Sequence, residues 1–318
     1  MGTFIIRRLL QGVVILILVS LIVFISMRLL PGDPILLIVT SSEWEEFTEK
    51  QMEQLRHEYG LDRPMYVQYV NWIGKFVTGD FGVSILTHRA VRDEILKRAL
   101  ISLHLGLTSF IFGNLIGIPM GIVAAVRRGK WADTVVTVLA NIGMTVPSFW
   151  LGFLLVYLFG LQLAWLPTMG YISPFEDFWL NLKQIIMPVA CLVVFPISGT
   201  ARQIRSSLIE VMHQDYIRTA WSKGLSERVV VVKHAIRNAI IPIVTLAGMH
   251  LSIIIGGSVL IETVFNIPGM GYLLVSSVSN QDYPYVQAIT MIIGTTIVLI
   301  NIVVDIIYGY IDPRVHYD

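Results

Sequence analysis

Six long, mostly apolar stretches of the chain contain no Asp, Glu, Lys or Arg. A helix needs ~20 consecutive apolar residues to cross the hydrocarbon core of a bilayer. The pattern therefore predicts six transmembrane helices, within residues 9–27, 99–126, 134–175, 184–201, 238–261 and 283–304. The third stretch is longer than a span requires. Trp165, Pro167 and Gly170 indicate that its helix ends near Leu161 and that an external loop follows.

The first apolar stretch follows Arg7 and Arg8, as the apolar part of a signal peptide would. It is longer than the usual ~7 to 15 residues of such a segment, and the sequence after Arg28 has no small-x-small cleavage pattern. We interpret it as a retained membrane anchor.

The positions of Lys and Arg indicate the orientation, because short cytoplasmic loops are enriched in them. With the amino terminus inside, 13 of the 23 basic residues fall in inner segments. Nine of the other ten lie within residues 28–98, where a long translocated segment weakens the rule, and the two short outer loops carry only Lys183. Both termini are therefore predicted to be cytoplasmic.

The spans divide the chain into segments. We expect a first transmembrane helix in 1–30, an extracytoplasmic insert in 31–98, a core of five helices in 99–311 and a cytoplasmic tail in 312–318. The core contains a long inner loop, 202–238, and an external loop, 262–284. The insert is predicted to pack on the outer ends of the helices. Its expected elements are a turn at 31–34, an acidic helix over 43–59, a helix opened by Pro64, and an interfacial helix or solvated loop over 89–98.

The composition places the chain in the membrane and excludes several kinds of chemistry. Hydrophobic residues make up 55% of it, charged residues 14%, and the net charge is +1, so no basic field suggests nucleic acid. Cys191, the single cysteine, excludes an intrachain disulfide and a thiolate cluster, and is expected to be a small core residue. No phosphate-binding loop, zinc motif or serine elbow is present.

The predicted spans lack charged residues at membrane depth, which ion-driven pumps usually carry. Energy for transport is therefore expected to come from elsewhere. We expect the buried polar residues to form hydrogen bonds between helices, and Asp305 to face the interface or a neighbouring group; the polar residues are His104, Asn114, Asn141 and His250.

Small residues and prolines recur in the spans. Glycines four residues apart in the second helix, 113, 117 and 121, and Gly248, Ser252 and Gly256 in the fifth, form smooth ridges that could pack within the chain or against a partner. Four prolines, 119, 147, 188 and 196, can bend their helices, either as static kinks or in a bundle that opens and closes.

The inner loop 202–238 carries seven basic and three acidic residues and the signals of a short helix. Asp215 is predicted to cap a helix that starts at Tyr216, and Gly224 to end it in the left-handed conformation. Ile217, Ala220 and Trp221 share one side of this helix. Ser226 is predicted to cap a second helix that leads back to the membrane at Pro242.

Two interpretations of the short helix remain open on physical grounds. A basic amphipathic helix can lie on anionic lipid. It can also dock into a groove of a cytoplasmic protein, where Ala220 would permit close approach and Trp221 or Tyr216 would anchor it.

The residues of this loop carry a family resemblance. Asp215-Tyr-Ile-Arg-Thr-Ala-Trp-Ser-Lys-Gly-Leu-Ser-Glu and His234-Ala-Ile-Arg-Asn-Ala-Ile-Ile-Pro242 resemble the EAA loop of permease subunits of binding-protein-dependent ABC importers. The general pattern is Glu-Ala-Ala, three residues, Gly, nine residues, then Ile-x-Leu-Pro. Ala220 and Gly224 match it. Arg218, Thr219 and the stretch 234–237 depart from it in the way that suits the dipeptide, oligopeptide and nickel branch.

The resemblance extends over nearly the whole chain. Further stretches that look like this family are Arg7-Arg8-Leu-Leu through Pro31-Gly32-Asp33-Pro34, Tyr59 to Pro64, Gly79-Asp80-Phe81-Gly82, Val146 to Gly152, Glu262 to Gly271, and Asp282-Tyr-Pro284. Within the loop 262–284, Pro268, Gly269 and Gly271 are expected to shape a sharp turn.

The resemblance implies an all-α, multi-pass inner-membrane protein with the type I ABC importer permease fold. Its expected partners are a homologous second permease, two cytoplasmic ABC ATPases, an extracytoplasmic solute-binding protein and membrane lipid. ATP and Mg would bind the ATPases, so the chain itself is expected to hold no cofactor or metal and to be no enzyme. The implied mechanism is alternating access. The residues expected to couple to the ATPases are Asp215, Tyr216, Ile217, Arg218, Thr219, Ala220, Trp221, Lys223 and Gly224.

The alternatives belong to other classes. A stand-alone channel or facilitator would need no ATPase and would have no evident use for the loop 202–238. An intramembrane enzyme would need paired carboxylates, metal ligands or a nucleophile with its base, and no convincing set occurs. The substrate stays open among dipeptides, oligopeptides, nickel complexes and glutathione.

Overall fold

The computed structural model describes residues 2–29, 49–58 and 62–311, and its regular elements in that part are helical. The one β feature among them is an isolated bridge between Val83 and Ala90. The all-α prediction is confirmed. The helices are α1 (Gly2–Leu29), α3 (Glu49–Glu58), α4 (Met65–Val77), α5 (Val91–Val126), α6 (Trp131–Thr145), α7 (Ser148–Leu155), η1 (Val156–Gln162), α8 (Phe178–Met212), α9 (Asp215–Ser222), α10 (Glu227–Val229), η2 (Val230–Ala235), α11 (Ile236–Ala239), α12 (Ile241–Val264), α13 (Met270–Ser279) and α14 (Tyr283–Ile311).

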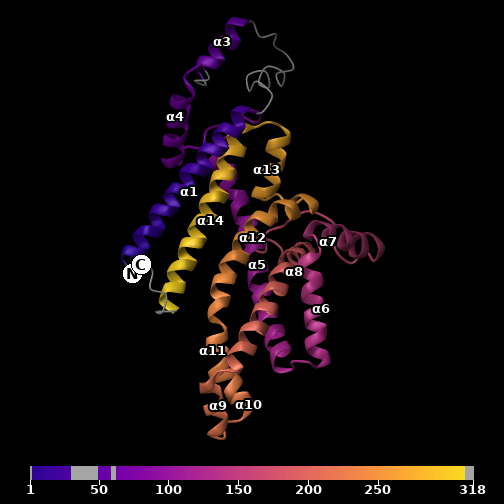
Figure 1. Ribbon diagram of the computed structural model, residues 1–318. Coiled ribbons are helices and arrows are strands. Elements are labelled where there is room, and N and C mark those ends of the chain that lie inside the picture. The colour runs from indigo at the N-terminus through magenta and orange to yellow at the C-terminus, as the bar shows by residue number, and fades with distance from the viewer. Residues whose placement is uncertain (1, 30–48, 59–61, 312–318) are drawn as a thin grey trace. The chain divides into compact units, whose positions relative to one another are not determined.

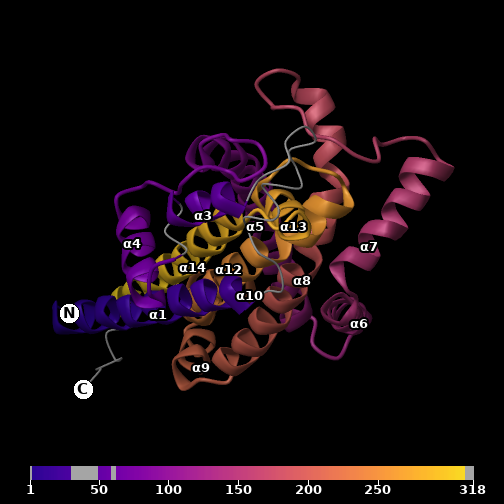
Figure 2. The ribbon, with the colours of Figure 1, turned by 90° about the horizontal axis from the view of Figure 1, so that it is seen from above.

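Five described helices are long and apolar enough to cross a membrane, and α6 with α7–η1 makes a sixth span if the bent pair is counted as one. The third predicted helix is thus broken by a bend of 100°. Figure 2 views α6 nearly along its axis while α7 lies across the view. Pro147 precedes α7, and because its ring clashes with a helical conformation of the residue before it, Val146 is extended. The helix ends at Gln162, as predicted, and the side of the membrane on which the termini lie stays a prediction.

The other three prolines do not break their helices. Pro119 lies inside α5, and Pro188 and Pro196 lie inside α8, which runs without interruption for 35 residues. Helices buried among neighbours tolerate such prolines because nearby groups can satisfy the freed carbonyls. Among the four candidates, Pro147 alone marks a break between helices.

The chain divides into two compact units, each described here by itself. Unit 1 comprises Met1–Arg8, Leu103–Ile267 and Leu299–Asp318, and unit 2 comprises Leu9–Ser102 and Pro268–Val298. In unit 1, α8 is the central helix, and α6, α7, α11 and α12 pack against it. Figure 1 shows α6 beside α8, with α9, α10 and α11 gathered at one end of α8.

The glycine ridge of the second predicted helix packs within the chain, against α8. A Cβ at Gly117 would lie 2.9 Å from Thr200 Cβ, and one at Gly121 would lie 2.6 Å from both Ala201 O and Ile204 Cβ. Such distances are too short for any larger residue, so the glycines set how closely the two helices approach.

The ridge of small residues on the fifth predicted helix does not pack against one neighbouring helix along its length. Gly248 faces Val304 of α14, whose side chain would collide with an added Cβ, whereas Gly256 has no other heavy atom within 4 Å of that position. Gly256 is thus free of packing against the described part of the chain.

The polar residues of the spans fulfil the hydrogen-bonding prediction in part. His250 shares a long hydrogen bond of 3.5 Å with Thr200 on α8, and His104 bonds the hydroxyl of Tyr171 in the loop after η1. Asn114 donates to the carbonyl of Phe110 on its own helix, so the prediction of an interhelical bond is wrong there. For Asn141, which is exposed, no interhelical bond is described.

Two further expectations are met in unit 1. Asp305 pairs with Arg8 at 3.0 Å and so faces a neighbouring group. Cys191 is a buried free thiol at 1% exposure, as expected of a core residue.

In unit 2 the predicted insert packs on the first helix. Tyr69 of α4 bonds Ser20 of α1 at 2.8 Å, and Tyr69 and Trp72 stack around Phe24. The helix opened by Pro64 is confirmed as α4, and α3 is the described part of the predicted acidic helix. The predicted turn at 31–34, the start of the acidic helix and its end at Gly60 lie outside the described residues.

The predicted interfacial segment 89–98 is not a separate element. From Val91 onward it is the first part of α5, which continues to Val126 without a break. Val91 and Ile95 are buried in an apolar cluster with residues of α13 and α14, and this packing explains the segment's amphipathic pattern. The Asp-Phe-Gly sequence at 80–82 lies in the turn before it, with Gly82 at φ +81°.

The buried carboxylate of Asp282, just before α14, is bonded to the segment that follows Gly82. Asp282 accepts a hydrogen bond from the Ser84 hydroxyl at 2.5 Å and another from the Ile85 N–H at 3.2 Å. The sharp turn expected within 262–284 lies between α12 and α13. Its left-handed residue is Asn266, at φ +48°.

Candidate functional site

The short helix predicted in the inner loop is α9, and it follows α8 after two residues, His213 and Gln214. The predicted loop therefore starts later than expected, because residues 202–212 belong to α8. Gln214, not Asp215, occupies the N-cap position, since its carbonyl accepts from the N–H groups of Ile217 and Arg218. Asp215 is the first helical residue, where a negative charge still interacts favourably with the helix dipole.

The end of α9 is as predicted. Lys223 is the C-cap, and Gly224 adopts φ +76°, a left-handed conformation that glycine enters without steric cost. The Gly224 N–H donates to the carbonyl of Trp221 at 2.9 Å. The chain then turns into α10, whose N-cap position is occupied by Ser226, although the serine side chain makes no capping hydrogen bond.

One face of α9 is fixed to its own chain. Ile217 is 0% and Ala220 7% exposed, and they form one apolar cluster with Leu208 of α8, Val230 and Ala235 of η2, and Ala239 of α11. Ile122 and Ala125 at the end of α5 pack against it. Trp221 shares the side of Ile217 and Ala220 by its helical spacing, as predicted, but it is not a member of this cluster and is 41% exposed. Ala220 is itself covered by this cluster, and its role at a partner's surface stays a prediction.

The rest of the α9 surface is exposed and combines aromatic and charged side chains. It carries Asp215, Tyr216, Arg218, Thr219, Trp221 and Lys223. Tyr216, 42% exposed, accepts a hydrogen bond from Asn238 at 2.7 Å, and the Thr219 hydroxyl donates to the carbonyl of Asp215. A half-exposed Trp and Tyr flanked by cations form a surface suited to anchoring a protein partner.

The segment after α9, formed by α10, η2 and α11, supplies other residues of the cluster. After α10 the backbone forms the π-helical turns of η2, in which Val230, Val231 and Ala235 are buried. It returns through α11 to Ile241, and Pro242 stands in the first turn of α12, where its missing N–H costs nothing. The helix predicted after Ser226 is therefore present, and it contributes Val230, Ala235 and Ala239 to the apolar cover of α9.

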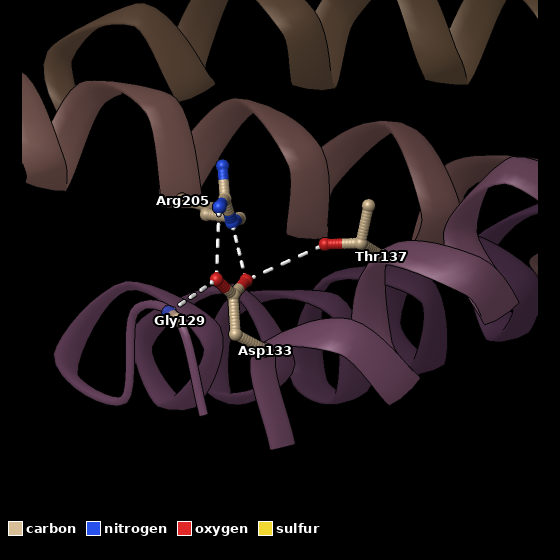
Figure 3. A network of polar contacts seen from close by, with 4 residues as sticks. All are labelled: Gly129, Asp133, Thr137 and Arg205. Atoms are coloured by element: carbon tan, nitrogen blue, oxygen red, sulfur yellow. Dashed lines mark hydrogen bonds and ion pairs between the residues drawn. The ribbon is translucent and has the colours of Figure 1, made fainter. Parts of the chain in front are cut away.

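A polar site that the sequence analysis missed lies beside this cluster. Asp133, in the first turn of α6, receives the guanidinium of Arg205 on α8 through Nε at 2.5 Å and Nη2 at 2.9 Å. The same carboxylate accepts from the Gly129 N–H at 3.0 Å and weakly from the Thr137 hydroxyl at 3.4 Å (Figure 3). The available signal was a single acid beside three basic residues at the entrance of an apolar stretch.

The predicted external loop after η1 belongs to unit 1, and hydrogen bonds hold it to neighbouring elements of that unit. The Gly170 N–H donates to the carbonyl of Phe265, and Ile172 bonds the side chains of Asn181 and Gln184 on α8. Burial raises the pKa of the Tyr171 hydroxyl above its ordinary value, so this group is neutral where it meets His104. Among the described residues, no three His, Cys, Asp or Glu side chains come together as metal ligands.

Two family models match the chain and together cover most of it. Residues 117–317 match the binding-protein-dependent transport system inner membrane component, and residues 1–105 match the N-terminal model of the same kind of membrane component. The first match includes α9 and the residues around it.

Curated relatives match over the full length. A putative peptide transport system permease protein of Brucella suis biovar 1 is 43% identical over 319 residues, and the glutathione transport system permease protein GsiC of Escherichia coli K12 is 40% identical over 317 residues, with 100% of each chain covered in both cases.

Solved structures match the fold. Inward-facing structures of the MetNI methionine ABC transporter align with TM-scores of 0.54 and 0.56, at 18% identity, over 69% of this chain and 96% of theirs. At this identity the likeness shows the fold alone, which is the one expected from the sequence.

Proposed function

The chain belongs to the family of binding-protein-dependent transport system inner membrane components, and from this premise we propose that it is the permease subunit of an ATP-driven importer of small peptides. The peptide class is supported by full-length relatives whose names specify peptide and glutathione transport. Glutathione is itself a short peptide, so both names describe one chemical class. Selection within it is assigned to a separate extracytoplasmic binding protein.

The observation that carries the proposal is the two-faced environment of α9. Its inner face is buried against α5, α8, η2 and α11, and its outer face offers Tyr216, Trp221 and Lys223 to another molecule. A helix held in this way moves as one body with the ends of α5 and α8. A push on the exposed face is therefore delivered to two membrane-spanning helices.

We assign the exposed face to a cytoplasmic ATPase, which also places both termini in the cytoplasm. Two ATPases would bind ATP and Mg, a second permease would complete the pathway, and this chain would alternate between inward-open and outward-open states. Anionic lipid is the competing occupant of α9. A lipid surface accounts for Lys223 and Arg218 but gives no reason for a helix so firmly fixed to α8.

The gene neighbourhood gives the first test. We expect genes for a second permease, ABC ATPases and a secreted binding protein beside the gene for this chain. In vesicles, the full complex should accumulate labelled dipeptide, tripeptide or glutathione only with ATP and the binding protein. The chain alone should move none of them. Flux through the chain alone would favour a channel and refute the proposal.

Trp221→Ala tests the docking face directly. Because Trp221 lies outside the buried cluster, the variant should keep α9 folded but reduce copurification of the ATPases. Loss of one aromatic anchor at an interface costs about 2 kcal/mol or more, which is ~30-fold in affinity. Trp179→Ala, at a tryptophan 71% exposed at the start of α8, is the matched control and should not change ATPase binding. Equal ATPase binding by both variants would assign α9 to lipid.

A further inference from the structure

We propose that Asp133 and Arg205 form a coupling strut, a pair of positioning residues that makes α6 follow the end of α8 when α9 is displaced. This inference rests on the proposed function, because it concerns how a push on α9 reaches the membrane helices. It adds α6 to the membrane-spanning helices α5 and α8, which contact the α9 cluster.

The pair has the geometry of a rigid connection. Both carboxylate oxygens of Asp133 are engaged by the planar fork of Arg205, at 2.5 Å and 2.9 Å (Figure 3). A bidentate pair fixes the relative orientation of its two groups as well as their distance. Apolar contacts on the same helix pair, such as Val194 against Gly143, restrict separation but resist sliding less.

The carboxylate is fully occupied by these contacts. A carboxylate has about four acceptor positions, and Asp133 receives two bonds from Arg205, one from the Gly129 N–H and one from the Thr137 hydroxyl. Gly129 belongs to the turn between α5 and α6, and the bond therefore ties that turn to the same point. With its side chain 8% exposed, Asp133 has little access to water or to a passing solute.

The location of Arg205 places the pair next to the α9 cluster. Leu208, three residues further along α8, is fully buried against Ile217 and its neighbours. Ile204, the residue before Arg205, lies against Gly121 of α5. The last turns of α8 thus contact α5 through Ile204 and α6 through the ion pair. The helix α9 follows them in the chain.

A role in stability alone accounts poorly for this choice of residues. Asp133 is 8% and Arg205 32% exposed, so the pair loses part of its attraction to the desolvation of the carboxylate. Where such a carboxylate is buried, apolar residues of similar size often stabilise a protein as well. An ion pair does supply a fixed register between two helices. Register between α6 and α8 is what a displaced α9 would need in order to move α6.

The main experiment compares uptake with ATP hydrolysis in vesicles that contain the full transporter complex. Asp133→Asn keeps the size of the side chain but removes its charge, and Arg205→Lys keeps the charge but loses the fork. We expect peptide uptake per ATP hydrolysed to fall ~10-fold in Asp133→Asn and less in Arg205→Lys, with ATP hydrolysis within about twofold of wild type. The control is Asp305→Asn, which removes another ion pair between helices, Arg8–Asp305, with a contact at 3.0 Å and both side chains about one third exposed. It should leave the ratio unchanged.

A covalent rescue separates positioning from mere stability. Asp133→Cys with Arg205→Cys, in a Cys191→Ala background, should be uncoupled as reduced protein and recover at least half of the wild-type ratio after reaction with a short bis-maleimide. Recovery requires only that the two helices be joined, whatever the chemistry of the link. Failure of the joined protein to recover would overturn the proposal, as would a wild-type ratio in Asp133→Asn or an equal fall in Asp305→Asn.

A measurement on the purified full-length chain keeps the strut testable if the complex imports no peptide. Hydrogen exchange in Asp133→Asn should be ~10-fold faster than wild type both in the first turn of α6 and in α9, and unchanged there in Asp305→Asn. Unchanged exchange in α9 would overturn the strut. Absence of ATP-dependent uptake by the wild-type complex would instead refute the proposed function.

Discussion

Gly121→Ala adds one methyl group at the closest approach of α5 and α8. The new Cβ would lie 2.6 Å from the carbonyl oxygen of Ala201 and 2.6 Å from Cβ of Ile204. Both neighbours are close to the backbone of α8, so neither can rotate away. The substitution therefore tests whether glycine is required here for packing.

The magnitude follows from these distances. Non-bonded heavy atoms normally meet at about 3.5 to 4.0 Å, so the helices must separate locally by about 1 Å. Overpacking of this kind costs ~1 to 3 kcal/mol. Alanine also favours a helix over glycine by about 1 kcal/mol, which partly offsets the cost. The net effect at Gly121 is a loss of ~0 to 2 kcal/mol in the free energy of unfolding.

Gly256→Ala is the matched control because no heavy atom lies within 4 Å of its added Cβ. The helix-propensity gain is common to both variants and cancels in the comparison. Gly256→Ala should therefore be more stable than Gly121→Ala by ~1 to 3 kcal/mol, a factor of about 5 to 150 in the equilibrium constant. Unfolding of each purified chain by SDS in mixed micelles, followed by tryptophan fluorescence, measures this difference.

The comparison refutes the packing argument if Gly121→Ala unfolds at the same SDS fraction as Gly256→Ala, or at a higher one. That result would mean that α5 and α8 do not approach at Gly121 in the folded protein. A change in the slope of the Gly121→Ala transition, as opposed to its midpoint, would indicate altered compactness and would require the comparison to be repeated with Gly117→Ala.

Four further predictions concern single sites. Ile217→Ala removes a fully buried side chain from the α9 cluster and should weaken the local attachment of α9 by ~2 to 5 kcal/mol, seen as faster hydrogen exchange in α9; unchanged exchange would contradict the burial. Gly224→Ala has steric room but φ +76°, so it should cost ~1 kcal/mol, and Gly224→Asn less, in the same exchange experiment. Tyr171→Phe removes the 2.9 Å bond to His104 and should lower the SDS midpoint by the equivalent of ~1 kcal/mol; an unchanged midpoint would mean that the bond contributes nothing. Cys191, 1% exposed, should react with maleimide only after unfolding in SDS, and rapid labelling of folded protein would contradict its position.

Local features of this protein follow from its sequence. The lengths of the apolar stretches give the membrane-spanning helices, because a span must satisfy its own backbone hydrogen bonds and cover the bilayer. Pro64 and Gly224 mark a helix start and a helix end through their own backbone preferences. The capping signal at Asp215 located α9 to within a residue of its observed start.

Residues of the same kind behave differently where contacts with distant parts of the chain determine the local structure. Pro147 breaks its helix, whereas Pro119 and Pro188 lie in continuous helices, and the sequence offers no local difference that separates them. The extent of the buried surface of α9 could not be predicted either. Ile217, Ala220 and Trp221 share a side at helical spacing, yet the cluster formed by α8, η2 and α11 covers only the first two.

The sequence by itself therefore determined which long apolar segments are helical and can cross a membrane, and to which family the chain belongs. It did not predict α13, which lies within the expected external loop 262–284. The tertiary structure alone decided that the ridge of Gly121 meets α8, that α9 presents Trp221 outward, and that Asp133 meets Arg205 across 72 positions of the chain. The physical reason is the range of the interactions. Helix formation and termination depend on groups within about four residues of one another, which a sequence displays directly. The pairing of helix faces depends on shape and charge brought together from distant positions, and it exists only once the chain has folded.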